Sequence, residues 1–142
     1  MTNQTRSAAY ALFVRGDDIL LGKRKGTGRW DGYYSPPCGG IEPGESILAG
    51  LAREIREETG VVIDPEDATL AHVRHRRGEG FEAVQYYFRV TAWDGEITNT
   101  EPGLCEGWGW WSINQMPQPF VPHTAAVIGL IHRGVRYSQS GW

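Results

Sequence analysis

Residues 39–61 read GGIEPGESILAGLAREIREETGV and contain the clearest helix pattern of the chain. Ser46 is a good N-cap residue, and Gly60 stands where a left-handed residue would end a helix. Between them lies an apolar stripe at helical spacing, made of Ile47, Leu48, Leu51 and Ile55. The pattern therefore predicts a helix over residues 46–59 that packs one face on a sheet.

Three carboxylates, Glu54, Glu57 and Glu58, stand at positions i, i+3 and i+4 of this helix. That spacing gathers them on one face, where like charges cost stability unless a cation offsets them. Arg53 can pair with Glu57, but one guanidinium does not balance three carboxylates. A hard divalent cation such as Mg²⁺ would, because it prefers oxygen ligands. On its own, the triad is more typical of a solvated acidic helix face with arginine partners.

A glycine-rich loop over residues 39–45 precedes the helix and delivers Glu45 to its start. Glycine lets the backbone fold tightly, so the carbonyls of Cys38 or Gly39 can face the carboxylates as further oxygen ligands. Gly50 costs the helix about 1 kcal/mol relative to alanine. Because Gly50 lies on the carboxylate face, we hypothesise that it leaves room beside a metal site.

At this point the sequence resembles the Nudix hydrolase family. Its defining box, G-x5-E-x7-R-E-U-x-E-E-x-G-U with U apolar, is matched at every fixed position: Gly39, Glu45, Arg53, Glu54, Ile55, Glu57, Glu58, Gly60 and Val61. So many fixed positions in one short window make a specific signal, unlike a lone glycine motif. The likeness to a single-domain, MutT-like member covers nearly the whole chain, and it is less specific outside the box.

The resemblance implies an α+β Nudix fold, a mixed β-sheet between helices (an α/β/α sandwich), in one domain over residues 1–142. It implies a hydrolase that cleaves a phosphoanhydride bond in a nucleoside diphosphate linked to another moiety, X, with Mg²⁺ or Mn²⁺. The implied metal ligands are Glu54, Glu57, Glu58 and the backbone oxygen of Cys38. Family members usually have glycine where this chain has Cys38. Arg53 is implied to orient the carboxylates rather than to touch the substrate.

Hydrolysis also needs a carboxylate that accepts a proton from the attacking water. MutT-like enzymes often use a glutamate on a later loop, and here Glu101 and Glu106 are the candidates; Glu54 is the third. The expected catalytic residues are therefore Glu54, Glu57, Glu101, Glu106 and Arg53.

Substrate contacts are expected from residues outside the box. Arg24 ends a predicted strand at a place where related enzymes hold a phosphate, and the planar fork of arginine suits that ligand. Trp30 and Phe81 lie in predicted loops and are candidates for stacking on a nucleobase. Tyr87 is expected in the core, as are Trp108, Trp110 and Trp111. His123 lies in a proline-rich segment before the last helix, near where some MutT-like enzymes read the base.

The rest of the chain predicts strands around this helix. Apolar and aromatic runs indicate strands over residues 8–15, 19–25, 69–77, 82–93 and 107–113, and a second helix over 124–132. Asp94-Gly95 is a turn signal, after which residues 96–99 are expected to continue the sheet. Residues 134–142 give no clear pattern.

Composition narrows the class of protein. A length of 142 residues suits one domain, and a net charge of −3 gives no basic field for long nucleic acid or an anionic membrane. The longest apolar run, residues 8–14, is far shorter than the roughly 18 residues of a membrane span. Residues 1–7 are polar and lack the apolar core of a secretory signal. With only two cysteines, we expect a cytoplasmic protein, monomeric or homodimeric, with a small nucleotide as its partner.

The leading prediction is a nucleoside triphosphate pyrophosphohydrolase that gives a nucleoside monophosphate and pyrophosphate, with oxidised nucleotides among its possible substrates. One alternative is a pyrophosphatase acting on ADP-ribose or nucleotide sugars. An alternative from another class is a non-catalytic Nudix-fold module that only binds a nucleotide.

Overall fold

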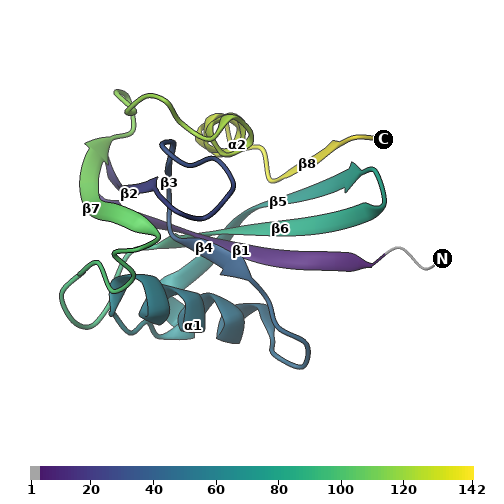
Figure 1. Cartoon of the computed structure of the whole chain (residues 1–142). Helices are drawn as coiled ribbons and strands as arrows, with labels where there is room; N and C mark the ends of the chain where they lie inside the picture. The colour runs from purple at the N-terminus through teal and green to yellow at the C-terminus, as the bar shows by residue number, and fades with distance from the viewer. Residues whose placement is uncertain (1–3) are drawn as a thin grey trace.

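A computed structural model describes residues 4–142; residues 1–3, the start of the polar N-terminal segment and of the predicted domain, lie outside the described part. Within these described residues, two helices and a short 3₁₀ turn accompany eight strands (Figure 1). In order, the elements are β1 (Thr5–Arg15), β2 (Asp18–Arg24), β3 (Tyr34–Ser35), β4 (Cys38–Gly40), α1 (Ile47–Thr59), η1 (Pro65–Asp67), β5 (Ala68–Gly78), β6 (Phe81–Val90), β7 (Cys105–Ser112), α2 (Pro122–His132) and β8 (Tyr137–Ser140).

The strands form one mixed sheet in the order β3-β2-β1-β6-β5-β8, with β4 pairing with β1 and β7 with β2. The β1–β6 and β5–β8 pairs are parallel, and the other pairs are antiparallel. The predicted strands over residues 8–15 and 19–25 are confirmed as β1 and β2, which form a hairpin with Val14 opposite Ile19 across the turn. Strand β1 therefore holds the sheet together, because it pairs with β2, β4 and β6.

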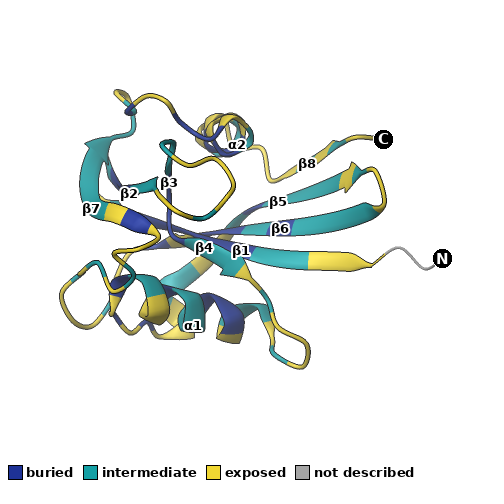
Figure 2. Cartoon of the chain, viewed as in Figure 1, coloured by how far each residue is buried: buried dark blue, intermediate teal, exposed yellow. Residues whose placement is uncertain are grey.

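The two faces of β1 serve two separate cores. Side chains alternate between the faces of a strand. One core lies between the sheet and α1 and contains Ala9, Ala11, Phe13, Leu51 and Ile55. The other lies between the sheet and α2 and contains Tyr10, Leu12, Tyr87, Val127 and Ile128. Figure 1 shows the helices on opposite sides of the sheet, and Figure 2 shows buried residues on both helices and on the central strands, so the predicted α/β/α sandwich is confirmed.

Helix α1 begins and ends at the predicted residues. The Ser46 hydroxyl accepts a hydrogen bond from the Ala49 N–H at 3.1 Å, and Gly60 ends the helix in the left-handed region with φ of 79°. Within residues 4–142, neither α1 nor α2 is long and apolar enough to cross a membrane.

Three local predictions differ from the structure. Residues 96–99 form no strand, because this segment crosses the end of α1: the Thr98 N–H donates to the Thr59 carbonyl at 2.9 Å. Phe81 is the first residue of β6 rather than a loop residue, and His123 lies in the first turn of α2. Residues 134–142, for which no pattern was found in the sequence, include β8, which pairs with β5. The buried His72 ring of β5 contacts Val135 O and Ser138 Oγ, both at 2.8 Å, and so holds this segment in place.

Candidate active site

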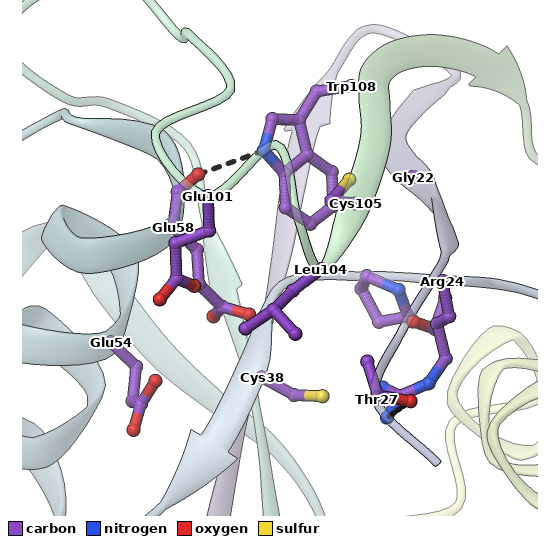
Figure 3. Close-up of a pocket in the computed structure, with 12 residues that line it drawn as sticks. Gly22, Arg24, Thr27, Cys38, Glu54, Glu58, Glu101, Leu104, Cys105 and Trp108 are labelled. Carbon is purple, nitrogen blue, oxygen red and sulfur yellow. Dashed lines mark hydrogen bonds between the residues drawn. The ribbon is translucent and has the colours of Figure 1, made fainter. Parts of the chain in front are cut away.

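The box helix borders a cavity of about 270 Å³ between α1, β4, and the β2–β7 pair. Figure 3 shows Glu54, Glu58 and Glu101 on one side of it, Arg24 and Thr27 on the other, and Cys38 between them. The lining residues are Gly22, Arg24, Thr27, Ser35, Pro36, Cys38, Glu54, Glu58, Glu101, Leu104, Cys105 and Trp108. Three carboxylates and one guanidinium therefore face each other across one small space.

Glu58 is the most perturbed acid in this cavity. Burial raises its pKa to about 9, and the nearby charges of Glu54 and Glu101 add to the effect. Its Oε2 atom is closed off from solvent and has no hydrogen-bond partner within residues 4–142. A buried oxygen without a partner is costly, so this position suits a ligand that supplies positive charge.

The Arg53 guanidinium joins the glycine-rich loop to the helix. Its Nη1 donates to Glu54 at 2.9 Å and to Glu57 at 3.2 Å. Its Nε and Nη2 donate to the Glu45 carboxylate at 3.0 and 2.6 Å, and Nη2 also donates to the Gly40 carbonyl at 2.9 Å. These bonds hold the pKa of Glu45 at about 2, well below its usual value. Arg53 thus contacts Glu45, Glu54 and Glu57 together.

Two glycines of the box make room for these carboxylates. A Cβ atom on Gly39 would collide with the Glu54 carboxyl group at well under 3.0 Å. A Cβ atom on Gly50 would lie 2.5 Å from Ile41 Cδ1 and 2.9 Å from Glu45 Oε1. The space beside Gly50 is therefore filled by the glycine-rich loop, which corrects our hypothesis that it borders a metal; Gly39 is the glycine that clears space for Glu54.

The donors around the cavity fit a divalent cation in their chemistry. The Ala11 N–H bonds Pro37 O and the Ile41 N–H bonds Ser7 O, each at 2.8 Å. Because the backbone groups of successive strand residues alternate in direction, the Cys38 carbonyl points away from β1. Carboxylate and carbonyl oxygens are the ligands that Mg²⁺ prefers. As placed in the described part of the chain, no three His, Cys, Asp or Glu side chains converge closely enough to hold a metal ion. The ligand set of Cys38, Glu54, Glu57 and Glu58 stays a prediction.

The other expected catalytic acids occupy different surroundings. Glu101 lines the cavity beside Glu54 and Glu58. Glu106 lies outside it, with an exposed side chain whose carboxylate is 3.9 Å from Lys23 Nζ. Glu57 is exposed on the Arg53 side of the helix. The structure thus separates Glu101 from Glu106 by position.

A second cavity, of about 460 Å³, adjoins the first and shares Arg24, Ser35 and Cys38 with it. Trp30, Phe81 and His123 all line this second cavity, as does Arg24, whose Nε donates to the Arg29 carbonyl at 2.9 Å. The residues expected to contact the phosphate and the base therefore line the same cavity. Burial lowers the pKa of His123 to about 4, with further lowering by nearby arginines, so its ring is neutral at pH 7.

The expected core aromatics divide in two. Tyr87 is fully buried, as predicted, and its ring stacks on Tyr10 with centroids 4.3 Å apart. Trp110 and Trp111 pack against the two cores as partly buried residues. Trp108 packs there too, but it also lines the first cavity, and its Nε1 donates to the Glu58 carbonyl at 3.0 Å (Figure 3).

The family model of the NUDIX domain matches residues 4–129 of this chain. The chain belongs to the Nudix family. Among solved structures, this Nudix domain is similar to a MutT NUDIX hydrolase from Burkholderia pseudomallei, with 30% sequence identity and a TM-score of 0.80. That likeness covers 89% of this chain and 98% of the other.

Two groups of characterised relatives resemble this Nudix domain. It is 32% identical over 136 residues to the 8-oxo-dGDP phosphatase NUDT18 of Danio rerio, a match covering 92% of this chain. It is 34% identical over 107 residues to the NAD-capped RNA hydrolase NudC of Stutzerimonas stutzeri, a match covering 75% of this chain. The match spans 38% of that NUDT18 and 36% of that NudC, so most of each relative lies outside the matched region.

Several cavity residues of the Nudix domain were not predicted from the sequence. Thr27, Leu104 and Cys105 reach the first cavity from loops and from the β2–β7 pair, and Gln85 and Thr124 reach the second from β6 and α2. One usable signal was Gly22 within a strand, which can mark close backbone approach. A side chain there would meet Cys105 Sγ and Trp108 at 2.7 Å.

Proposed function

We propose that this Nudix domain is a metal-dependent hydrolase of a phosphoanhydride bond in a nucleoside diphosphate linked to another moiety. The observation that carries the proposal is the buried, unpartnered Oε2 of Glu58, a residue that lines a cavity together with Glu54, Glu101 and, opposite them, Arg24. Acidic oxygens on one side and a guanidinium on the other match the needs of a diphosphate with its cation.

The residues take distinct roles in this proposal. Glu54, Glu57, Glu58 and the Cys38 carbonyl hold Mg²⁺ or Mn²⁺, which neutralises phosphoryl charge and lowers the pKa of a bound water. Arg53 positions the carboxylates through its bonds to Glu54 and Glu57. Glu101, the loop acid that lines the cavity, accepts the proton of the attacking water.

Arg24 binds a phosphate where the two cavities meet, because it lines both of them. The nucleoside then occupies the second cavity, where Trp30 and Phe81 offer aromatic faces to the base.

The substrate in this proposal is a nucleoside triphosphate, released as a nucleoside monophosphate and pyrophosphate. The similarity to NUDT18, named an 8-oxo-dGDP phosphatase, supports testing oxidised guanine nucleotides. The similarity to NudC, named an NAD-capped RNA hydrolase, keeps dinucleotide diphosphates and ADP-ribose as the second candidate class. Cys38 and Cys105 are both free thiols, which suits the reducing cytoplasm as the place of action.

The test compares the wild type with Glu58→Gln and with Glu79→Gln, a matched change at an exposed glutamate in the β5–β6 turn. Each protein is incubated with Mg²⁺ or Mn²⁺ and a panel of canonical and oxidised nucleoside triphosphates and diphosphates, NADH, ADP-ribose and nucleotide sugars. Chromatography should show a nucleoside monophosphate from the wild type and Glu79→Gln, and at least about a 100-fold slower release from Glu58→Gln. Addition of a chelator should stop the reaction.

Equal and negligible turnover by all three proteins would contradict hydrolysis and leave the binding-module alternative. Equal, measurable turnover by wild type and Glu58→Gln would contradict the role of the buried carboxylate.

A further inference from the structure

Three rows of side chains lie on the sheet face that borders the second cavity, and Arg6, Ala8, Tyr10, Arg76, Ala83 and Gln85 of these rows line it. The strand register places Arg6, Ala83 and Arg76 side by side across β1, β6 and β5. The next row is Ala8, Gln85 and Arg74, and the third is Tyr10, Tyr87 and His72. Neighbours in register on one sheet face project in the same direction. The third row is covered by α2, whereas the first row opens into the cavity.

In the first row, Arg6 and Arg76 flank the small side chain of Ala83. Neighbouring strands lie about 4.8 Å apart, so the backbones of Arg6 and Arg76 are separated by roughly 10 Å. Ala83, between them, leaves an open space above the sheet because its side chain is a single methyl group. The Arg76 guanidinium is held in place over the Phe81 ring, with Cζ 5.0 Å from the ring centroid.

These arginines lack the acidic partners that exposed arginines usually have. Arg6, Arg24, Arg29 and Arg76 all line the cavity, and no Asp or Glu is among its described lining residues. None of the four forms an ion pair within residues 4–142, in contrast to Arg53, which contacts three carboxylates. The cavity is therefore lined by positive charge with no carboxylate among its described lining residues, and of its four arginines Arg24 alone also lines the first cavity with Glu54, Glu58 and Glu101.

A neutral nucleobase does not require this charge. The diphosphate at the first cavity is already served by Arg24, whereas the Arg6 row lies four residues, or roughly 13 Å, along β1 from Tyr10, which pairs with Cys38. Between these points Gln85 lines the cavity from the sheet. Thr124 lines it from α2, and its hydroxyl is buried and has no partner among the described residues. Arg6 and Arg76 thus lie well past the position of the scissile diphosphate, and Gln85, between them and Tyr10, gives a polar lining suited to a sugar or base.

We propose that Arg6 and Arg76 bind a second phosphate group of the substrate, one that is separate from the scissile diphosphate. The inference rests on the proposed function and narrows the substrate class to nucleotides phosphorylated at the 2′ or 3′ position of the ribose. The planar guanidinium forks bind the phosphate oxygens with charge-assisted hydrogen bonds.

The test measures equilibrium binding, by calorimetry in the presence of a chelator, so that it is independent of turnover. The ligands are adenosine 5′-monophosphate, its 2′,5′- and 3′,5′-bisphosphates, the matched guanosine 5′-monophosphate and 3′,5′-bisphosphate, and inorganic phosphate. The proteins are the wild type, Arg6→Gln, Arg76→Gln and Arg77→Gln. Arg77 is a matched control, because it is the next residue of β5, projects to the other face and lies over Trp142.

We expect a bisphosphate to bind the wild type at least about tenfold more tightly than the monophosphate, as one charge-assisted hydrogen bond or more would give. Arg6→Gln and Arg76→Gln should reduce that ratio to less than about threefold, whereas Arg77→Gln should keep it. Arg76→Lys, which keeps the charge and loses the fork, should give an intermediate ratio.

Equal binding of mono- and bisphosphates by the wild type would overturn the proposal, as would a preference that survives in both Arg6→Gln and Arg76→Gln. Inorganic phosphate that binds as tightly as a bisphosphate would reduce the site to a general anion site and also overturn it. If the wild type showed no turnover of the nucleotide panel, nor of nucleoside triphosphates that carry a 2′ or 3′ phosphate, but kept the bisphosphate preference, the result would contradict the proposed hydrolysis alone.

Discussion

Gly39→Ala tests whether the space beside the glycine-rich loop sets the position of Glu54. An alanine Cβ would lie well under 3.0 Å from the Glu54 carboxyl group, where ordinary contacts are about 3.5–4.0 Å. The carboxylate must therefore move by roughly 1 Å or more, although Arg53 holds it at 2.9 Å. A shift of this size in a reacting group lowers the rate about 100-fold.

The cost in stability is expected to be smaller than the cost in function. Overpacking in a filled site destabilises a protein by about 1–3 kcal/mol. Because Glu54 can shift toward the cavity, we expect the lower end of that range, and a fall in Tm of about 3–6 °C. Circular dichroism gives the melting curve, calorimetry the Mn²⁺ affinity, and chromatography the rate of nucleotide hydrolysis.

Gly40→Ala provides the matched control. A Cβ atom there meets nothing within 4 Å among the described residues, so stability, metal affinity and rate should stay close to wild type. If Gly39→Ala behaved like Gly40→Ala in metal affinity and rate, the reasoning about Glu54 would be wrong.

Three further changes test other parts of the molecule. Glu101→Gln should slow hydrolysis by about 100-fold or more, while Glu106→Gln, outside the cavity, should change it less than about twofold; steady-state kinetics on both variants decide this. The pKa of His123 falls from 6.5 to about 4 on folding, because of burial and then of Arg74, Arg76, Arg29 and Arg24, so wild-type stability should fall as the pH drops from about 6.5 toward 4. His123→Gln should weaken that fall in urea unfolding at pH 7.5 and 5, and an unchanged slope would contradict it. Leu51→Ala, in the core beneath α1, should cost about 2–5 kcal/mol in the same assay, and a cost below 1 kcal/mol would contradict the packing described.

Local signals were enough to predict the parts of the fold that are held by local contacts. Helix α1 has its cap at Ser46, its left-handed end at Gly60 and its apolar stripe in one continuous segment. Strand β8 has no such pattern, because the sequence YSQS is polar and is held by long-range contacts, such as the bond from Arg74 to Ser140. The turn signal before residues 96–99 predicts a strand there, but their backbone bonds to the end of α1, which is distant in sequence. Nearby sequence carries no signal for such a contact.

The site was predictable to the same extent. The box carboxylates share one helix, so their spacing alone places them together. The choice between Glu101 and Glu106 depended on how the loop before β7 folds over α1, which only the structure shows. The row of Arg6, Ala83 and Arg76 depends on the register of three strands that are distant in sequence, and a register is fixed by the whole sheet.

Strand β1 separates two cores, so substitutions on one side of the sheet need not disturb the packing on the other. The box helix rests on the core of Leu51 and Ile55, whereas the floor of the second cavity continues into the core of Tyr10 and Tyr87 on the opposite face. Substitutions at distant positions without shared neighbours have nearly additive effects. Under the proposed function, changes on the α2 face that spare Arg24, Ser35 and Cys38, which line both cavities, can therefore alter which nucleotide is accepted while the carboxylates of α1 keep their positions, so one scaffold can pass from one substrate to another by separate steps.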